Sequence, residues 1–369
     1  MKSKILLVGP INDQGIGGRF EEMRVWVRFL EEEQFNVSVF SMFNSRFGLE
    51  NAKMVESVHL VFPNFWSWFP GLRNLILRVW SSRFFRNQRD NFYASKKWLV
   101  FARSFNHIIL FITHQSREIK IFDSSLPVAV SIRFTGTVHD FSILKNHHKK
   151  LSKAARNYVI HAPGLFYGFE NSIPKVYIDQ TTLAEKLLLH LKIDANLKVF
   201  AMIGLFMEVK QMEEVINVFA KLPNLNLILF GTGELQTSYQ NQIDTLGLSN
   251  VKIAGFVAPD QIALLYAQID ALIINSSEET GPMTGIEAMA SGKLILSRPV
   301  GAMRERLRDP EMIFDKAEDL IEKIKRYSSL PPEKIIEYKT TLRTRYLENY
   351  SNLQVKKQIK NMLEGVSDT

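Results

Sequence analysis

Short apolar runs alternate with longer amphipathic stretches along the chain, and this alternation restricts the possible folds more than any other feature. An apolar run of strand length followed by an amphipathic segment of helical length is typical of a βα unit, and successive βα units build a parallel sheet. The alternation is interrupted from Ala162 to Pro174, where proline and glycine punctuate an aromatic stretch, and it starts again near Val199. We therefore expect an α/β protein with two doubly wound sheets, one on each side of the interruption.

The apolar runs predict the strands of each sheet. In the first sheet, strands are expected at Lys4–Val8, Val37–Ser41, Val58–Phe62, His107–Thr113, Val128–Arg133 and Tyr158–His161, with a helix from Arg19 to Glu33. In the second sheet, strands are expected at Val199–Ile203, Asn226–Phe230, Val251–Ala254, Ala271–Asn275 and Leu294–Ser297. The residues after Pro332 have a charged, helical pattern and are expected to end the chain as helix.

Length and composition limit the class of protein. A chain of 369 residues exceeds one typical core and fits two domains, and its 46% hydrophobic and 23% charged residues are typical of a globular protein. No apolar run reaches the length of about 18 residues that a membrane-spanning helix needs, and the N-terminal run is too short for a signal peptide. The absence of cysteine excludes disulfides, thiolate metal sites and a cysteine nucleophile. We therefore expect a cytoplasmic protein.

The formal net charge of +8 favours an acidic partner, such as a nucleotide, an anionic membrane surface or a nucleic acid. The segment from Pro63 to Arg103 concentrates eight basic residues and four of the five tryptophans. Within it, apolar residues recur at helical spacing from Leu72 to Trp80, which fits either a helix at a membrane surface or a core helix. We expect peripheral binding at the inner face of an anionic membrane and no nucleic-acid partner, since no RNA-binding motif accompanies the basic residues.

The segment from Ile273 to Met289 places two carboxylates around a strand-to-helix turn. Glu279 lies on the turn, and Glu287 follows eight residues later, about one turn inside the helix. The unpaired N–H groups and positive end of a helix suit a phosphate, while carboxylates accept hydrogen bonds from neighbouring hydroxyls. The expected ligand is therefore anionic and polyhydroxylated, and a nucleotide sugar has both kinds of group.

The same segment carries a resemblance to a known family. Glu279 followed, after seven residues, by Glu287-Ala-Met-Ala-Ser-Gly resembles the E-x7-E signature of GT4-type retaining glycosyltransferases of GT-B fold, and the segment from Pro299 to Glu305 resembles the next block of that family. The resemblance implies two Rossmann-like domains facing a cleft. The N-terminal, acceptor-side domain would span residues 1–170, the nucleotide-sugar-binding domain residues 171–345, and a C-terminal helix in residues 346–369 would pack back on the N-terminal domain.

The resemblance also implies the roles of individual residues. Glu279 would bind sugar hydroxyls, Glu287 the ribose hydroxyls, and Lys210 the diphosphate; the catalytic set would be Glu279, Lys210 and His139. The remaining donor-binding residues would be Gly17, Gly18, Gly204, Gly231, Phe256, Val257, Thr280, Gly281, Pro282, Met283 and Thr284. Gly17 and Gly18 belong to a glycine-rich helix entry, where missing side chains allow close approach of backbone N–H groups to a ligand.

The chain departs from the family pattern beside Lys210. The family has Gly-Arg-Leu and then Lys-Gly, whereas this chain has Leu205 at the arginine position and Gln211 at the glycine position. Only half of the basic clamp on the diphosphate is therefore present, and Arg298 and Arg304 are candidates to replace the missing arginine.

The histidine of the reacting centre has three candidate positions. Two alignments compete for the strand that begins near Val128: one matches His139-Asp140, and the other places Thr135-Gly136 at the histidine position. His114, after the preceding strand, is a third candidate for the wall of the cleft.

The predicted function is transfer of a sugar from a nucleotide-sugar donor to a lipid-linked or saccharide acceptor hydroxyl, with retention, in bacterial envelope polysaccharide synthesis. No cofactor or metal is expected, because the chain lacks the metal-binding Asp-x-Asp and Lys210 with a helix dipole would neutralise the diphosphate. The alternatives are a nucleotide-sugar epimerase on the same fold, which would need no acceptor, and a non-catalytic nucleotide-sugar-binding partner subunit, which Leu205 suggests.

Overall fold

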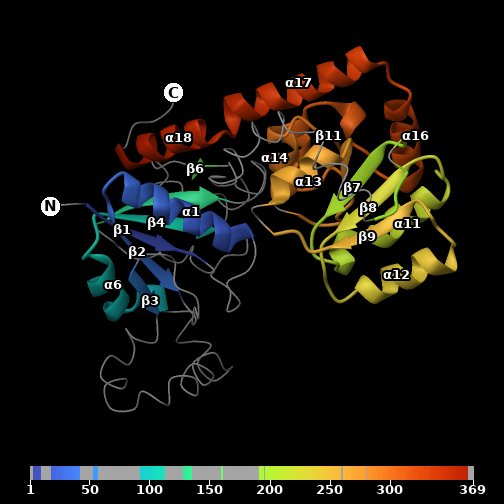
Figure 1. The fold of residues 1–369 in the computed structure, drawn as a ribbon. Coiled ribbons are helices and arrows are strands. Elements are labelled where there is room, and N and C mark those ends of the chain that lie inside the picture. The colour runs from blue at the N-terminus through green and yellow to red at the C-terminus, as the bar shows by residue number, and fades with distance from the viewer. Residues whose placement is uncertain are drawn as a thin grey trace. The chain divides into compact units, whose positions relative to one another are not determined.

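The computed structural model describes residues 3–9, 18–41, 53–56, 92–112, 128–134, 159–160, 191–194, 196–258, 261–279 and 281–364. The chain forms two compact units. We refer to residues 1–165 with 355–369 as the N-terminal domain and to residues 166–354 as the C-terminal domain. Figure 1 shows the elements of both as ribbons.

The N-terminal domain is built on a six-stranded parallel sheet in the order β3-β2-β1-β4-β5-β6. Its described elements are β1 (Lys4–Val8), α1 (Gly18–Glu32), β2 (Asn36–Ser41), β3 (Lys53–Glu56), η3 (Phe92–Ala94), α6 (Lys96–Ala102), β4 (His107–Ile112), β5 (Ala129–Phe134) and β6 (Val159–Ile160). The order reverses between β1 and β4, which confirms the predicted doubly wound sheet. The strand predicted at Val58–Phe62 lies outside the described residues, and the position beside β2 is taken by Lys53–Glu56.

An aromatic cluster forms much of the N-terminal core. Trp98 is fully buried, and its ring lies 4.9 Å from that of Phe40 and 5.1 Å from that of Tyr93 in edge-on contacts. Edge-on aromatic pairs of this kind add stability beyond the area they bury. The expected membrane role of the aromatic segment is therefore wrong for Trp98, which is a core residue, and the other three tryptophans of that segment lie outside the described residues.

The C-terminal domain is built on a five-stranded parallel sheet in the order β11-β10-β7-β8-β9. Its strands are β7 (Val199–Ile203), β8 (Asn226–Phe230), β9 (Val251–Gly255), β10 (Ala271–Ile274) and β11 (Leu294–Ser297). The intervening helices are η5 (Glu208–Lys210), α11 (Met212–Ala220), α12 (Gln236–Thr245), α13 (Ile262–Gln268) and α14 (Met283–Ala290). They are followed by α15 (Met303–Leu307), η7 (Pro310–Met312), α16 (Ala317–Ser328) and α17 (Pro332–Asn349).

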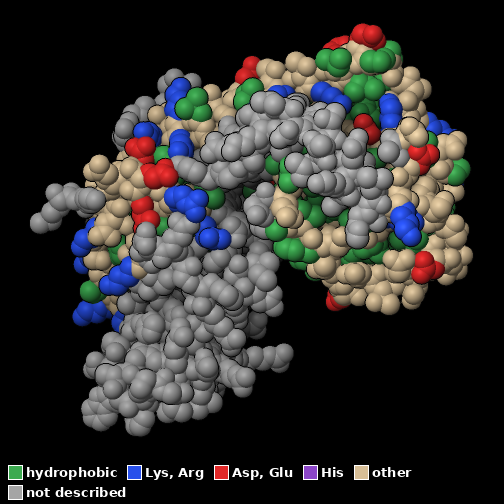
Figure 2. Space-filling model, in the orientation of Figure 1, with side chains coloured by type: hydrophobic (Ala, Val, Ile, Leu, Met, Phe, Trp, Pro, Cys, Tyr) green, Lys and Arg blue, Asp and Glu red, His purple; other side chains and the backbone are tan. Residues whose placement is uncertain are grey.

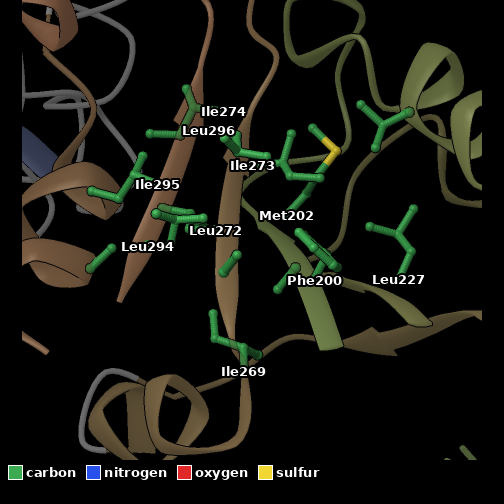
Figure 3. Packing of buried hydrophobic residues seen from close by; sticks show 14 of the residues in the cluster. Phe200, Met202, Leu227, Ile269, Leu272, Ile273, Ile274, Leu294, Ile295 and Leu296 are labelled. Carbon is green, nitrogen blue, oxygen red and sulfur yellow. The ribbon is translucent and has the colours of Figure 1, made fainter. Parts of the chain in front are cut away.

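Most strands of this sheet are buried and largely apolar, as is typical of a parallel sheet whose two faces are covered. Every residue of β8, β10 and β11 is buried, and the side chains of β7, β10 and β11 pack together in Figure 3. Phe200 and Leu272 are fully buried at this contact. The five predicted strands agree with those observed to within one residue at each end, because the apolar runs have strand length and are bounded by turn residues, which favours a strand over a longer helix.

Helix α17 holds the helices that follow β10 and β11. Arg343 donates to the carbonyl of Ala290 at the end of α14, and Arg345 donates to the carbonyls of Arg306 and Leu307 at the end of α15. The last carbonyls of a helix have no intrahelical partner, and a basic side chain satisfies them while opposing the negative end of the helix dipole. The ends of α14 and α15 are therefore fixed by one long helix.

The final helix, α18 (Asn352–Glu364), packs on the N-terminal domain as predicted. Lys356 lies 3.7 Å from Glu32, Lys360 lies 3.0 Å from Glu33, and the Lys356 ammonium lies 5.2 Å from the ring of Phe29. None of the helices in the described ranges is both long and apolar enough to cross a bilayer. On the face of the C-terminal domain seen in Figure 2, basic and acidic side chains are interspersed rather than gathered by sign.

Candidate functional site

The candidate site lies at the carboxyl edge of the C-terminal sheet. From β7 the chain runs outward through β8 to β9 and then returns to place β10 on the other side of β7. Ligands of open α/β sheets bind outside the carboxyl ends of the strands where the strand order reverses, which here is between β7 and β10. The loops after these two strands carry Lys210 and Glu279.

Lys210 and Glu279 form an ion pair at this point of reversal. The Lys210 ammonium donates to Oε1 of Glu279, and the Ser276 hydroxyl donates to the same oxygen at 3.1 Å. The backbone joins the two loops as well, because the N–H of Ser277 donates to the carbonyl of Val209 at 2.9 Å. The structure therefore brings together two of the three residues predicted as catalytic, although they are far apart in sequence.

Gln211 ends the Lys210 loop in a left-handed conformation, with φ 47° and ψ 40°. This conformation costs a side-chain-bearing residue about 1 kcal/mol relative to glycine. The departure from the family glycine at this position is therefore a small strain in the loop, and the loop keeps its shape through its other contacts. One of these is the hydrogen bond from the amide of Asn275 to the Gln211 carbonyl, at 2.9 Å.

Two glycines allow the loops after β7 and β8 to touch. Gly231 has φ 138°, and a methyl group on it would lie 1.8 Å from the carbonyl oxygen of Gly204. A methyl group on Gly233 would lie 2.5 Å from the carbonyl oxygen of Phe206, whose N–H donates to Thr232 at 2.9 Å. Gly204 in turn supports the Lys210 side chain, since a methyl group on Gly204 would lie 3.3 Å from Cε of Lys210. Gly204 and Gly231, which the sequence analysis assigns to the site, thus shape the loop that carries Lys210, together with Gly233.

The turn before α14 offers a second part of the site. Pro282 precedes the first helical residue, Met283, and the helix packs closely on α15, because a methyl group on Gly285 would lie 2.8 Å from Sδ of Met303. The first N–H groups of a helix lack intrahelical partners and carry partial positive charge. Gly281, Pro282, Met283 and Thr284 therefore lie at a helix start suited to an anion, while Thr280 lies outside the described residues.

Glu287 points to a different partner, Tyr266 on α13. The Tyr266 hydroxyl lies 3.0 Å from Oε2 of Glu287 and 3.0 Å from the carbonyl oxygen of Thr284. Burial raises the pKa of Glu287 to about 7, although the hydrogen bond from Tyr266 opposes this rise. Burial and the adjacent carboxylate raise the pKa of Tyr266 well above its usual value. Glu287 therefore lies where a ligand hydroxyl could replace the hydration that folding removed.

The raised pKa of Glu287 predicts how ligand-free stability depends on pH. The folded-state pKa of Glu287, about 7, exceeds the ordinary value of 4.5. The contribution of the neutral carboxyl to the free energy of unfolding is therefore full below pH 4.5 and is lost as pH rises through 7. We expect Glu287→Gln to be more stable than the wild type at pH 8 by about 2 kcal/mol and to lose this advantage at pH 4.5, since the amide stays neutral. Urea unfolding at several pH values measures the difference. A constant difference, or one that the exposed Glu278→Gln also gives, would contradict this assignment.

The predicted base-pocket residues present an apolar surface beside the site. Phe256 follows β9 and is 71% exposed, whereas Val257 packs partly against the core. Leu205, at the position of the family arginine, is 56% exposed, and Met207 on the same loop is 40% exposed. Leu205 and Met207 follow β7, whereas Phe256 follows β9, two strands away in the sheet. The carboxyl edge of the sheet therefore offers apolar area against which a flat ligand group could stack.

The arginines proposed to replace the family arginine have other environments. The guanidinium of Arg298 donates to Asn275 at 2.7 Å, to the carbonyl of Asp315 at 2.8 Å and to Glu214 at 2.6 Å. Burial pushes the pKa of Glu214 upward, but hydrogen bonds from Asn275 and Arg298 outweigh it and leave that pKa below its usual value. Arg298 therefore holds β11 to α11, and Arg304 is exposed. The arginine that contacts the turn before α14 is Arg306.

Several predicted residues lie outside the described ranges. These are Gly17, His139, the alternative pair Thr135-Gly136, and His114. Gly18 is the first residue of α1. His107 is described, but it serves the core: it shares a hydrogen bond of 2.7 Å with Ser131, and burial lowers its pKa to about 4.

Among the residues that the structure describes, no three acidic or histidine side chains gather into a group that could hold a metal ion.

The structure adds three residues to the site that the sequence did not predict: Ser276, Tyr266 and Arg306. Ser276 and Tyr266 carry no local signal, because they reach the two glutamates only through the packing of separate loops and helices. Arg306, in contrast, does carry a local sequence signal. It stands with Met303 and Leu307 on the buried face of α15, where an apolar residue is the usual choice.

The C-terminal domain resembles a known protein family. Residues 186–341 match the model of the family described as glycosyl transferases group 1. No curated protein sequence matches the chain. Among solved structures, the Anabaena protein Alr3699/HepE in complex with UDP is 16% identical, with a TM-score of 0.69 over 98% of this chain and 100% of that chain.

Two further structures show the same fold. A glycosyltransferase from Rickettsia africae ESF-5 is 17% identical, with a TM-score of 0.68 over 100% of both chains. The lipopolysaccharide outer core galactosyltransferase WaaB is 13% identical, with a TM-score of 0.61 over 98% of this chain and 99% of that chain. At such identities the likeness establishes the fold.

The fold of the chain is that of the GT-B glycosyltransferases, and its C-terminal domain carries the family match. The match to the glycosyl transferases group 1 family covers residues 186–341, which make up most of the C-terminal domain. The predicted resemblance to GT-B glycosyltransferases is thereby confirmed.

Proposed function

We propose that the protein transfers a sugar from a nucleotide-sugar donor to the hydroxyl of a lipid-linked or saccharide acceptor, with retention of configuration. The observation that carries this proposal is the ion pair of Lys210 and Glu279 at the reversal of strand order between β7 and β10. It joins a cation for a diphosphate to a carboxylate for sugar hydroxyls, beside a helix start that favours phosphate. The UDP and UDP-glucose complexes of Alr3699/HepE, which shares the fold, support a donor of this class.

In this proposal the chemistry depends on positioning and charge. The bond between the anomeric carbon and the diphosphate oxygen breaks, and a bond to the acceptor oxygen forms on the same face of the sugar. The acceptor proton passes to the departing diphosphate. Lys210 and the first N–H groups of α14 stabilise the negative charge that develops there, Glu279 holds the sugar hydroxyls, and Glu287 holds the ribose. His139 is proposed at the reacting side, and no metal is required.

The proposal is tested first with the full-length protein and candidate donors. We expect one of the UDP-, GDP- or ADP-sugars to raise the melting temperature, and that donor to yield free nucleoside diphosphate and glycosylated product when saccharide or lipid-linked acceptors are added. Nuclear magnetic resonance of the product gives the configuration, and EDTA leaves the rate unchanged. Conversion of the donor sugar without any acceptor would instead identify an epimerase. Binding without turnover under all acceptors would identify a nucleotide-sugar-binding subunit.

Exposed basic side chains support a proposal for where the protein works. We propose that the protein works at the inner, anionic face of a membrane in bacterial envelope polysaccharide synthesis, a setting consistent with the structural likeness to WaaB. Among the described residues, Lys96 and Lys97 on α6 and Arg103 directly after it are exposed basic side chains, and Val100 on the same helix is 61% exposed. Basic side chains near an anionic surface contribute about 1 kcal/mol each. Flotation with anionic but not zwitterionic liposomes is the expected result, and equal behaviour with both would refute membrane docking.

A further inference from the structure

Arg306 is a charged side chain buried directly behind the turn that begins α14. Only 3% of it is exposed, and it lies between Met303 and Leu307 on the inner face of α15. Its Nη1 donates to the carbonyl of Pro282 at 2.7 Å and lies 3.9 Å from Sδ of Met303. Burying a guanidinium is unfavourable unless its donors are satisfied, so such a residue in place of an apolar one calls for a specific role.

The fit between Arg306 and the turn depends on Gly281. A methyl group on Gly281 would lie 2.7 Å from Nη2 of Arg306 and 3.5 Å from Cζ, which is closer than a side chain can approach without displacing the guanidinium. The guanidinium therefore occupies the space that a side chain at position 281 would fill. Gly281 thus leaves room for the guanidinium of Arg306, and Arg306 in turn supports the turn by its hydrogen bond to Pro282.

The position of the charge matters because the helix start is the proposed phosphate site. Pro282 accepts hydrogen bonds from Arg306 and from the N–H of Gly285, at 3.2 Å, so the guanidinium is anchored to the first turn of α14. Charges interact more strongly through a protein interior than through water. A fixed cation behind this turn therefore adds to the positive potential that the α14 dipole already creates at its surface.

Among the residues that the structure describes, two further cations near the site are already paired in the ligand-free protein. Lys210 pairs with Glu279, and Arg298 pairs with Glu214. Leu205, which stands where the family has an arginine, is an exposed apolar side chain and supplies no charge. The backbone of Arg306 is fixed as well, because its carbonyl oxygen accepts a hydrogen bond from the guanidinium of Arg345 at 3.1 Å.

We propose that Arg306 is a positioning residue of the donor-diphosphate subsite, which supports the Gly281–Pro282 turn from behind and supplies the positive charge that Leu205 does not. The inference rests on the proposed function, since it assigns a role within the same donor site. It predicts that Arg306 affects the binding of a diphosphate far more than the binding of the nucleoside that lacks it.

The experiment compares a nucleoside diphosphate with its nucleoside. We would measure by calorimetry the dissociation constants of UDP and uridine, or of the guanosine or adenosine pair if the wild type prefers it, for wild type, Arg306→Met, Arg306→Lys and the exposed control Arg304→Met. We expect Arg306→Met to weaken diphosphate binding about tenfold while nucleoside binding changes less than twofold. Arg306→Lys retains the charge and is expected to lose about threefold. Arg304→Met is expected to behave as the wild type.

A second variant separates charge from folding. Leu205→Arg, added to Arg306→Met, places a cation on an exposed position and is expected to restore most of the lost diphosphate affinity. If the Met variant does not fold, Leu205→Arg is added to Arg306→Lys instead and is expected to raise its diphosphate affinity. Arg306 variants that bind the diphosphate as the wild type does, or that lose diphosphate and nucleoside equally, would overturn the inference alone. A wild type that binds none of the three diphosphates would instead overturn the proposed function.

Discussion

Replacing Glu279 by alanine is expected to lower kcat/KM for sugar transfer by about 10²- to 10³-fold, which corresponds to about 3 to 4 kcal/mol of transition-state stabilisation. The carboxylate accepts hydrogen bonds from Lys210 and Ser276 in the ligand-free protein, and in the proposed complex it accepts them from sugar hydroxyls. Hydrogen bonds to a charged group contribute about 1.5 to 3 kcal/mol each, so their loss accounts for an effect of this size.

The matched control is Glu278→Ala, because Glu278 is the exposed neighbour with the same side chain. We expect its transfer rate to stay within about twofold of the wild type. Steady-state kinetics with the donor found by screening would measure both variants, with the melting temperature recorded to exclude unfolding. Equal activities for Glu279→Ala and wild type would remove Glu279 from the reaction and favour a non-catalytic binding role.

The largest effect on stability is expected from Gly231→Ala. The added methyl group would lie 1.8 Å from the carbonyl oxygen of Gly204, so the loop after β7 must move away from the loop after β8. Backbone atoms cannot shift as a flexible side chain does, and we expect a loss of about 4 kcal/mol or more in the free energy of unfolding.

Gly247→Ala is the control for the backbone conformation, because Gly247 also has positive φ, 62°, but has no atom within 4 Å of the added methyl group. Its expected loss is about 1 kcal/mol, from the left-handed conformation alone. Urea unfolding of both variants would isolate the contact between the two loops. Similar losses for the two variants would show that the close approach is not what requires glycine at position 231.

Much of the site could be found from the sequence because its residues lie next to strong local signals. Glu279 follows a buried strand, Glu287 lies about one turn inside the next helix, and the segment between them has a recognisable spacing. Gly231 likewise ends a strand. Each of these was placed by the period of apolar residues and by the turn residues that bound it, which depend only on neighbours in the chain.

Other features of the site could not be predicted in this way. Arg298 was a reasonable candidate for the diphosphate, yet its donors are taken by Asn275, Glu214 and the backbone of Asp315. The basic and aromatic segment that contains Trp98 predicts a membrane surface, yet Trp98 is a core residue. An arginine or a tryptophan can lie at the surface or contact other residues inside the protein. Which of these it does depends on elements that are distant in sequence.

The amino-acid sequence by itself determined the two series of βα units, the strands of the second sheet and the carboxylates at the carboxyl edge, because hydrophobic period and turn chemistry are local properties. Only the tertiary structure decided that β10 lies beside β7, so that Glu279 meets Lys210, and that Arg306 fills the space left by Gly281. These contacts join residues far apart along the chain, and their geometry is set by how helices and loops pack once the sheet has formed.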